Sequence, residues 1–129
     1  MKTLDQAEPH IPLSEAGSIA EAGSYYPTNP ISGTWNTQAD NVTLDLNGFT
    51  ITRESTLAIR VSNSDKIRIF NGIIAGGTGS GISGSAMGSI SISDLRFFYI
   101  TGACIELTSP SGILMIERIH CHQATREGT

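Results

Sequence analysis

The chain carries little charge, and none of it is clustered. Only 16% of the 129 residues are charged, and 8 Lys and Arg stand against 12 Asp and Glu, which gives a formal net charge of -4. The arginines are dispersed at Arg53, Arg60, Arg68, Arg96, Arg118 and Arg126. Proteins that bind nucleic acid present a basic face to the phosphates. We therefore expect no nucleic-acid partner.

Long apolar runs and cysteines are also scarce. No stretch is long enough to cross a bilayer, and the first ten residues hold one lysine without the apolar segment of a secretory signal. We therefore expect no membrane partner. The two cysteines, Cys104 and Cys121, come with no other disulfide signature, which favours reduced thiols over a disulfide.

Small and β-branched residues are plentiful instead. The chain has 14 Gly with many Ser, Thr and Ile, and few good helix formers after residue 40, so we expect short strands and frequent turns within one domain. Four prolines punctuate residues 1–40, which we interpret as an N-terminal cap and lead-in. Two short strands around Ala22 and Gly23 would lay Ile19 and a tyrosine over the end of the core.

Residues 41–129 repeat with a period of about 23 residues. The apolar pairs are Leu44/Leu46, Ile67/Ile69, Ile90/Ile92 and Leu114/Ile116, and a second series is Ile59/Val61, Ile82/Gly84 and Ile105/Leu107. One residue separates the members of each pair, as in a strand with one inward face. Leucine-rich repeats have this period but need a leucine consensus and a helical return. We predict an all-β fold, a single-stranded right-handed parallel β-helix (solenoid) of about four coils whose last coil is incomplete.

Corner residues recur just after the first strand of each repeat, at Asn47, Asn71 and Asp94. Asn and Asp tolerate a left-handed backbone, which a sharp bend between strands needs. Stacked side chains of this kind can form an amide ladder along a solenoid. The fourth repeat has Arg118 at this position, so we expect the ladder to break there.

Four segments carry a family likeness: GSYY at 23–26, DNVTLDLNGFTI at 40–51, IRIFNGII at 67–74 and GACIELTSPSG at 102–112. Together they resemble the right-handed parallel β-helix proteins of the pectin-lyase-like superfamily over roughly residues 19–122. The resemblance implies an extracellular protein that acts on polysaccharide or forms an adhesin or tail-spike stalk. The polygalacturonase-like catalytic set is incomplete, because Asn36-Thr37-Gln38 lacks the acid and Arg118-Ile119-His120 has His for Lys. No acidic cluster for calcium, as in pectate lyases, is visible.

Stacking in register would place outward side chains in columns. One column is Asp45, Arg68, Ser91 and Met115, and the other is Arg60, Ser83 and Glu106. The candidate ligand-binding residues are therefore Asp45, Arg68, Arg60 and Glu106, on a surface where a polysaccharide can lie. His120 and His122 would share one strand face with the Cys121 thiol on the other, and with Glu117 they are the weak metal candidates. We expect no cofactor.

The last coil is incomplete. Cys121 is the counterpart of Phe97, so the counterpart of Ile105 is Thr129, where the sequence ends. An end coil exposes its apolar core and its backbone edges, so we expect a homo-oligomer formed through the Leu114/Ile116 end. We interpret the chain as a β-helix binding or structural module that adheres to polysaccharide. The alternative is the N-terminal part of a lyase or glycoside hydrolase acting on uronic-acid glycans, and whether this chain alone is an enzyme stays open.

Overall fold

The computed structural model describes residues 10–15, 17–52, 58–76, 80–100, 102–108 and 111–123, and every regular element in these ranges is a β-strand. The strands are β1 (His10–Leu13), β2 (Gly17–Ile19), β3 (Gly23–Pro27), β4 (Ile31–Ser32), β5 (Trp35–Thr37), β6 (Val42–Asp45), β7 (Thr50–Thr52), β8 (Ile59–Ser64), β9 (Ile67–Ala75), β10 (Ile82–Met87), β11 (Ile90–Ile100), β12 (Ile105–Thr108) and β13 (Leu114–Gln123). A search of the described residues finds no helix that could span a membrane.

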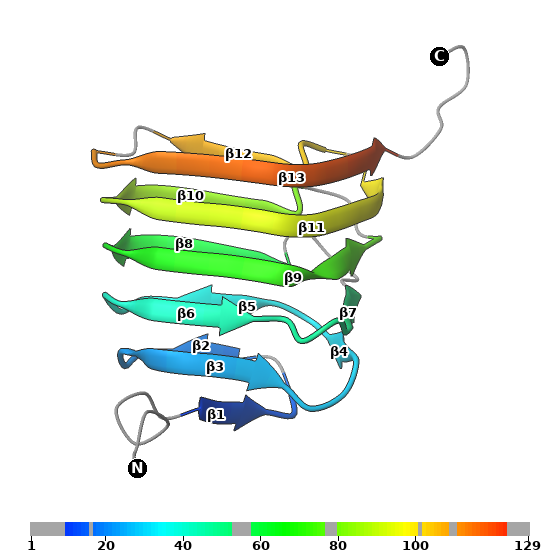
Figure 1. The fold of residues 1–129 in the computed structure, drawn as a ribbon, viewed down its shortest axis with the longest axis horizontal. Coiled ribbons are helices and arrows are strands. Elements are labelled where there is room, and N and C mark those ends of the chain that lie inside the picture. The colour runs from blue at the N-terminus through cyan, green and yellow to red at the C-terminus, as the bar shows by residue number, and fades with distance from the viewer. Residues whose placement is uncertain are drawn as a thin grey trace.

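The strands form two parallel sheets. The 8-stranded sheet has the order β1-β3-β6-β9-β11-β13 with β4 and β7 beside this path, and the 5-stranded sheet has the order β12-β10-β8-β5-β2. In Figure 1 the strands of the nearer sheet run to the right, those of the farther sheet run to the left, and the chain climbs from N to C. A coil with this sense is right-handed. The predicted fold class, a right-handed parallel β-helix of about four turns, is confirmed.

The N-terminal segment continues the same two sheets. The strands predicted on either side of Ala22 and Gly23 are present as β2 and β3, but they do not pair with each other. β2 pairs with β5, whereas β3 lies between β1 and β6. Ile19 and Tyr25 are both buried, as expected of residues that cover core. Both sheets therefore extend into the segment that the sequence predicts as a cap.

The core lies between the sheets and is built from inward columns of aliphatic side chains. Leu44, Ile69 and Ile92 stand on successive strands of one such column and are at most 1% exposed. Burying an aliphatic side chain of this size stabilises the fold by about 1.5–3 kcal/mol. Trp35 is also buried, and its indole Nε1–H donates to the Glu15 carbonyl at 2.9 Å. The alternation of apolar and polar residues thus sets which face of each strand is inside.

One predicted register is wrong. The sequence period pairs Leu44 with Ile67, whereas the structure pairs Val42 with Ile67 and Leu44 with Ile69. The difference arises at the following turn, where residues 46–49 stand opposite only residues 71 and 72. A slip of two residues keeps every side chain on its predicted face, because strands alternate with period 2. The later pairings, Ile67 with Ile90 and Ile90 with Leu114, are confirmed.

Candidate functional site

Residues with left-handed backbones mark the corners of the coils, and carboxylates accept hydrogen bonds at two of these corners. Asn47, Asn71, Asp94 and Arg118 all have left-handed backbones, with φ between 51 and 67°. At the first corner, Oδ1 of Asp45 accepts hydrogen bonds from the Asn47 backbone N–H at 2.8 Å and from Asn71 Nδ2 at 3.0 Å. The polar column therefore begins with a carboxylate–amide contact instead of the predicted amide ladder. Asp45, a predicted ligand-binding residue, has a structural partner on the next coil.

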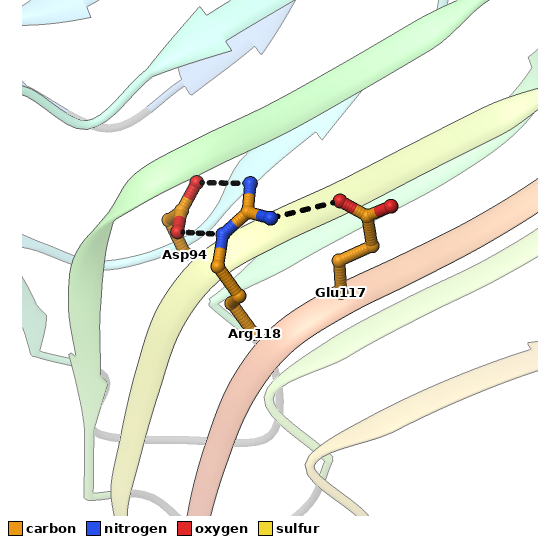
Figure 2. A network of polar contacts seen from close by, with 3 residues as sticks. All are labelled: Asp94, Glu117 and Arg118. Carbon is orange, nitrogen blue, oxygen red and sulfur yellow. Dashed lines mark hydrogen bonds and ion pairs between the residues drawn. The ribbon is translucent and has the colours of Figure 1, made fainter.

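At Arg118, where the sequence predicts that an amide ladder breaks, a charged contact joins the two coils instead of an amide. Figure 2 shows the Arg118 guanidinium between two carboxylates. Arg118 Nε and Nη2 donate to Asp94 Oδ1 and Oδ2 at 2.6 and 3.0 Å, and Nη1 donates to Glu117 Oε1 at 3.0 Å. The guanidinium holds the pKa of Asp94 below its usual range and has its own pKa raised in turn. A bidentate fork thus replaces the amide contact at this corner.

Asp45 and Arg68 do not share an outward column. Arg68 stands in register with Thr43 and Ser91, and Asp45 stands opposite Phe70, two residues further along the strand. The cause is the register difference described above, so the predicted place of Asp45 in this column is wrong, whereas Arg68, Ser91 and Met115 stand in register. The guanidinium carbon of Arg68 lies 4.5 Å from the centre of the Phe70 ring, which is within the range of a cation–π contact.

The second predicted column is confirmed as a structural register. Ser83 of β10 stands between Arg60 of β8 and Glu106 of β12, and Asn36 of β5 extends the column by one strand. Arg60 and Glu106 are exposed. Glu106 Oε1 accepts a hydrogen bond from Ser80 Oγ at 2.7 Å. The column therefore places an arginine and a glutamate on one outer face with a serine between them.

The terminal coil, formed by β12 and β13, leaves large apolar side chains exposed. Ile113, Leu114, Met115 and Ile116 are 72%, 46%, 47% and 44% exposed, and we call them the apolar end patch. Leu114 and Ile116 stand in register with Ile90 and Ile92, which are buried. They continue the core column, and they are exposed because β13 is the last strand of its sheet (Figure 1).

A groove runs beside the apolar end patch. It has a volume of about 390 Å³ and is lined by residues of β9, β11 and β13 or next to them, among them Lys66, Arg68, Ser91 and Met115. Ile113 lines it as well, so the groove and the patch form one continuous surface. The lining of the groove thus combines two cationic side chains, Lys66 and Arg68, with apolar ones.

The two cysteines form a disulfide, so the expectation of reduced thiols is wrong. Cys104 directly precedes β12, and Cys121 lies in β13 in register with the buried Phe97. The bond therefore ties together the last strands of the two sheets. The repeat gives Cys121 as the counterpart of Phe97, whose side chain is buried. This correspondence indicates that the Cys121 thiol lies on the inward face of its strand, where Cys104 also lies.

His120 and His122 lie on one face of β13, as predicted, and we call them the histidine pair. Their Nε2 atoms are 2.6 Å apart, and the His122 ring stacks on Phe98 with 5.3 Å between centroids and 6° between planes. Glu117, the third weak metal candidate, lies before the Arg118 corner and bonds to that guanidinium. Among the residues that the structure describes, no group of three or more His, Cys, Asp or Glu side chains is placed to hold a metal ion.

The chain matches no protein-family model, and neither a curated protein nor a solved structure is significantly similar to it. Inferences about its function therefore rest on its own geometry.

Proposed function

We propose that the chain is a β-helix structural and binding module that self-associates through its terminal coil. The observation that carries this proposal is the apolar end patch, in which Ile113 is 72% exposed and Leu114, Met115 and Ile116 are each exposed by more than 40%. Leu114 and Ile116 lie over the end of the core, and Met115 lies on the outer face of the same strand in register with Ser91. Large apolar side chains exposed close together on a protein surface mark an interaction site. Leu114 and Ile116 belong to the core column, so a matching coil end stacked on them would complete that column.

The partner we propose is a second copy that meets the first through the same end. β13 is ten residues long and contains no proline, and long unblocked edges of this kind pair with other strands. The opposite end of the same sheet is β1, which has four residues including Pro12, and proline blunts an edge. This asymmetry favours two terminal coils facing each other over a head-to-tail stack. A two-fold axis perpendicular to the solenoid then sets the two β13 strands antiparallel.

Three finer assignments belong to the same proposal. Membership of the pectin-lyase-like superfamily is supported by the β-solenoid architecture, and an extracellular location is supported by the Cys104–Cys121 disulfide, since such bonds persist in oxidising compartments. Adhesion to polysaccharide is supported by the exposed Arg60 and Glu106 column. The alternative of a polysaccharide lyase or glycoside hydrolase stays a prediction from the resemblance.

Sedimentation equilibrium over a wide concentration range tests the self-association. The wild-type chain should form a dimer reversibly, and Ile113→Asp should weaken it. Losing an apolar interface contact costs about 1 kcal/mol or more, and a two-fold dimer loses it in both copies, so the Kd should rise roughly thirtyfold. Ile113 is largely exposed, so the substitution should leave the monomer folded. The matched control is Arg60→Ser, on the outer face of the other sheet, which should dimerise like the wild type. A wild-type chain that stays monomeric at every concentration would refute the proposal.

A further inference from the structure

The histidine pair has the geometry of a bidentate metal chelate. His120 and His122 are two residues apart on one strand, so their side chains project from the same face of β13. Their Nε2 atoms are 2.6 Å apart and their ring planes are inclined by 31°, so the two nitrogens converge and share one proton. Both residues are exposed, and Phe98 stacks on His122 and limits the rotation of its ring. Little reorganisation is then needed to replace the shared proton with a metal ion.

The nitrogen separation selects among metals. Two imidazole nitrogens at about 2.0 Å from an ion lie about 2.8 Å apart in a cis square-planar site and about 3.3 Å apart in a tetrahedral site. The observed 2.6 Å is closer to the square-planar value. Tetragonal nitrogen sites are typical of Cu²⁺ and Ni²⁺, and Cu²⁺ binds most tightly in the divalent series.

We propose that the histidine pair is a surface site for Cu²⁺, bound through Nε2 of His120 and Nε2 of His122, with water completing the coordination. This site goes beyond the proposed self-association and does not depend on it. The charged neighbour that opposes a bound cation is Arg96, which stands in register with His120 on β11. Phe98, in register with His122, acts as a positioning residue through its stacked ring.

Titration of the chain with Cu²⁺ alone, followed by electron paramagnetic resonance, tests the site. The spectrum should show one copper per chain with coupling to two nitrogen nuclei. Loss of an outer-shell partner of a metal ligand lowers affinity 10–100-fold, so His120→Ala and His122→Ala, which each remove a ligand, should each weaken binding at least about tenfold. Both side chains are exposed, so neither substitution removes core packing.

Matched controls separate this site from other copper-binding groups. His10→Ala removes the third histidine of the chain and should leave the affinity unchanged. Arg96→Ser should tighten binding, because it removes the positive charge beside His120. Zn²⁺ should bind more weakly than Cu²⁺. Unchanged affinity in either His120→Ala or His122→Ala, or an equal loss in His10→Ala, would overturn the proposal.

Discussion

Asp45 and Asp94 each join two neighbouring coils at a corner of the solenoid. Each is a carboxylate beside a left-handed backbone turn, and each accepts a hydrogen bond from a side chain on the next strand of the sheet, Asn71 for Asp45 and Arg118 for Asp94. A carboxylate can accept several hydrogen bonds, so Asp45 both closes its own turn and links two coils, whereas Asp94 links two coils through Arg118. At the residue scale, the polar corners therefore stabilise the fold, and the Asp45 carboxylate is engaged in hydrogen bonds with Asn47 and Asn71.

The Arg118–Asp94 pair predicts a small, pH-dependent contribution to stability. The guanidinium lowers the pKa of Asp94 from 3.8, so the pair stabilises the fold above that value, and this contribution is lost as the pH falls through the lower pKa of the folded state. Arg118→Asn keeps a residue that tolerates the left-handed turn but removes the guanidinium. Urea unfolding should show the wild type more stable than the variant at about pH 6, with the difference shrinking towards about pH 2. A difference that stays constant with pH would show that the ion pair is not its cause.

Gly72, which follows the corner residue Asn71, has no room for a side chain because Leu46 of the preceding coil lies against it. A Cβ atom added there would lie 2.7 Å from Cδ1 of Leu46, which is fully buried. Gly72→Ala should therefore lower the free energy of unfolding by about 1–3 kcal/mol, the usual cost of overpacking a core. Gly17→Ala is the matched control, because a Cβ there would meet nothing within 4 Å. Equal urea midpoints for the two variants would contradict the close approach of Gly72 to Leu46.

At the scale of the strands, the terminal coil is held by a bond as well as by backbone pairing. Among the strands that the structure describes, β12 pairs with β10 alone and β13 pairs with β11 alone. Such an edge frays more easily than a strand with two neighbours. The Cys104–Cys121 disulfide joins the start of β12 to β13 and so links the last described strands of the two sheets.

Removal of this disulfide should destabilise the chain. Cys104 and Cys121 are 17 residues apart, and closing a loop of about that length contributes about 3 kcal/mol through the unfolded state. The double variant Cys104→Ser, Cys121→Ser should lose stability of this order in urea unfolding. Thiol titration of the unfolded wild-type chain without reductant should find no free thiol. Two titrating thiols would show that the bond is absent.

The strands and their inward faces could be predicted from the sequence because both follow from alternation. Ile59, Ile82 and Ile105 stack as their spacing indicates, since no residue is inserted between those strands. The pairing of Leu44 was missed because a turn two residues longer leaves alternation unchanged. Arg118 was placed at its corner by the repeat, but its ion pair with Asp94 was missed because the corner positions were interpreted as an amide ladder. The histidine pair could be placed on one face, whereas its convergence with Phe98 needed the neighbouring strand.

At the scale of the whole molecule, the two ends of the solenoid differ. The N-terminal end is a short strand with a proline, and the C-terminal end is a long strand with the apolar end patch. A solenoid extends its sheets and its core together when a new coil is added. Pairing of two terminal coils would therefore bury the patch and satisfy the backbone edges of β12 and β13 in one step.

Amide hydrogen exchange at low and high protein concentration tests this central claim most directly, because it reports which edge becomes paired. Self-association through the terminal coil predicts that amides of β13 gain protection as the concentration rises, while those of β1 keep the same exchange rates. Ile113→Asp should shift the gain in β13 to higher protein concentration, since it places a charge in the apolar end patch and weakens the dimer. Unchanged exchange in β13 at every concentration, or a gain confined to β1, would contradict it.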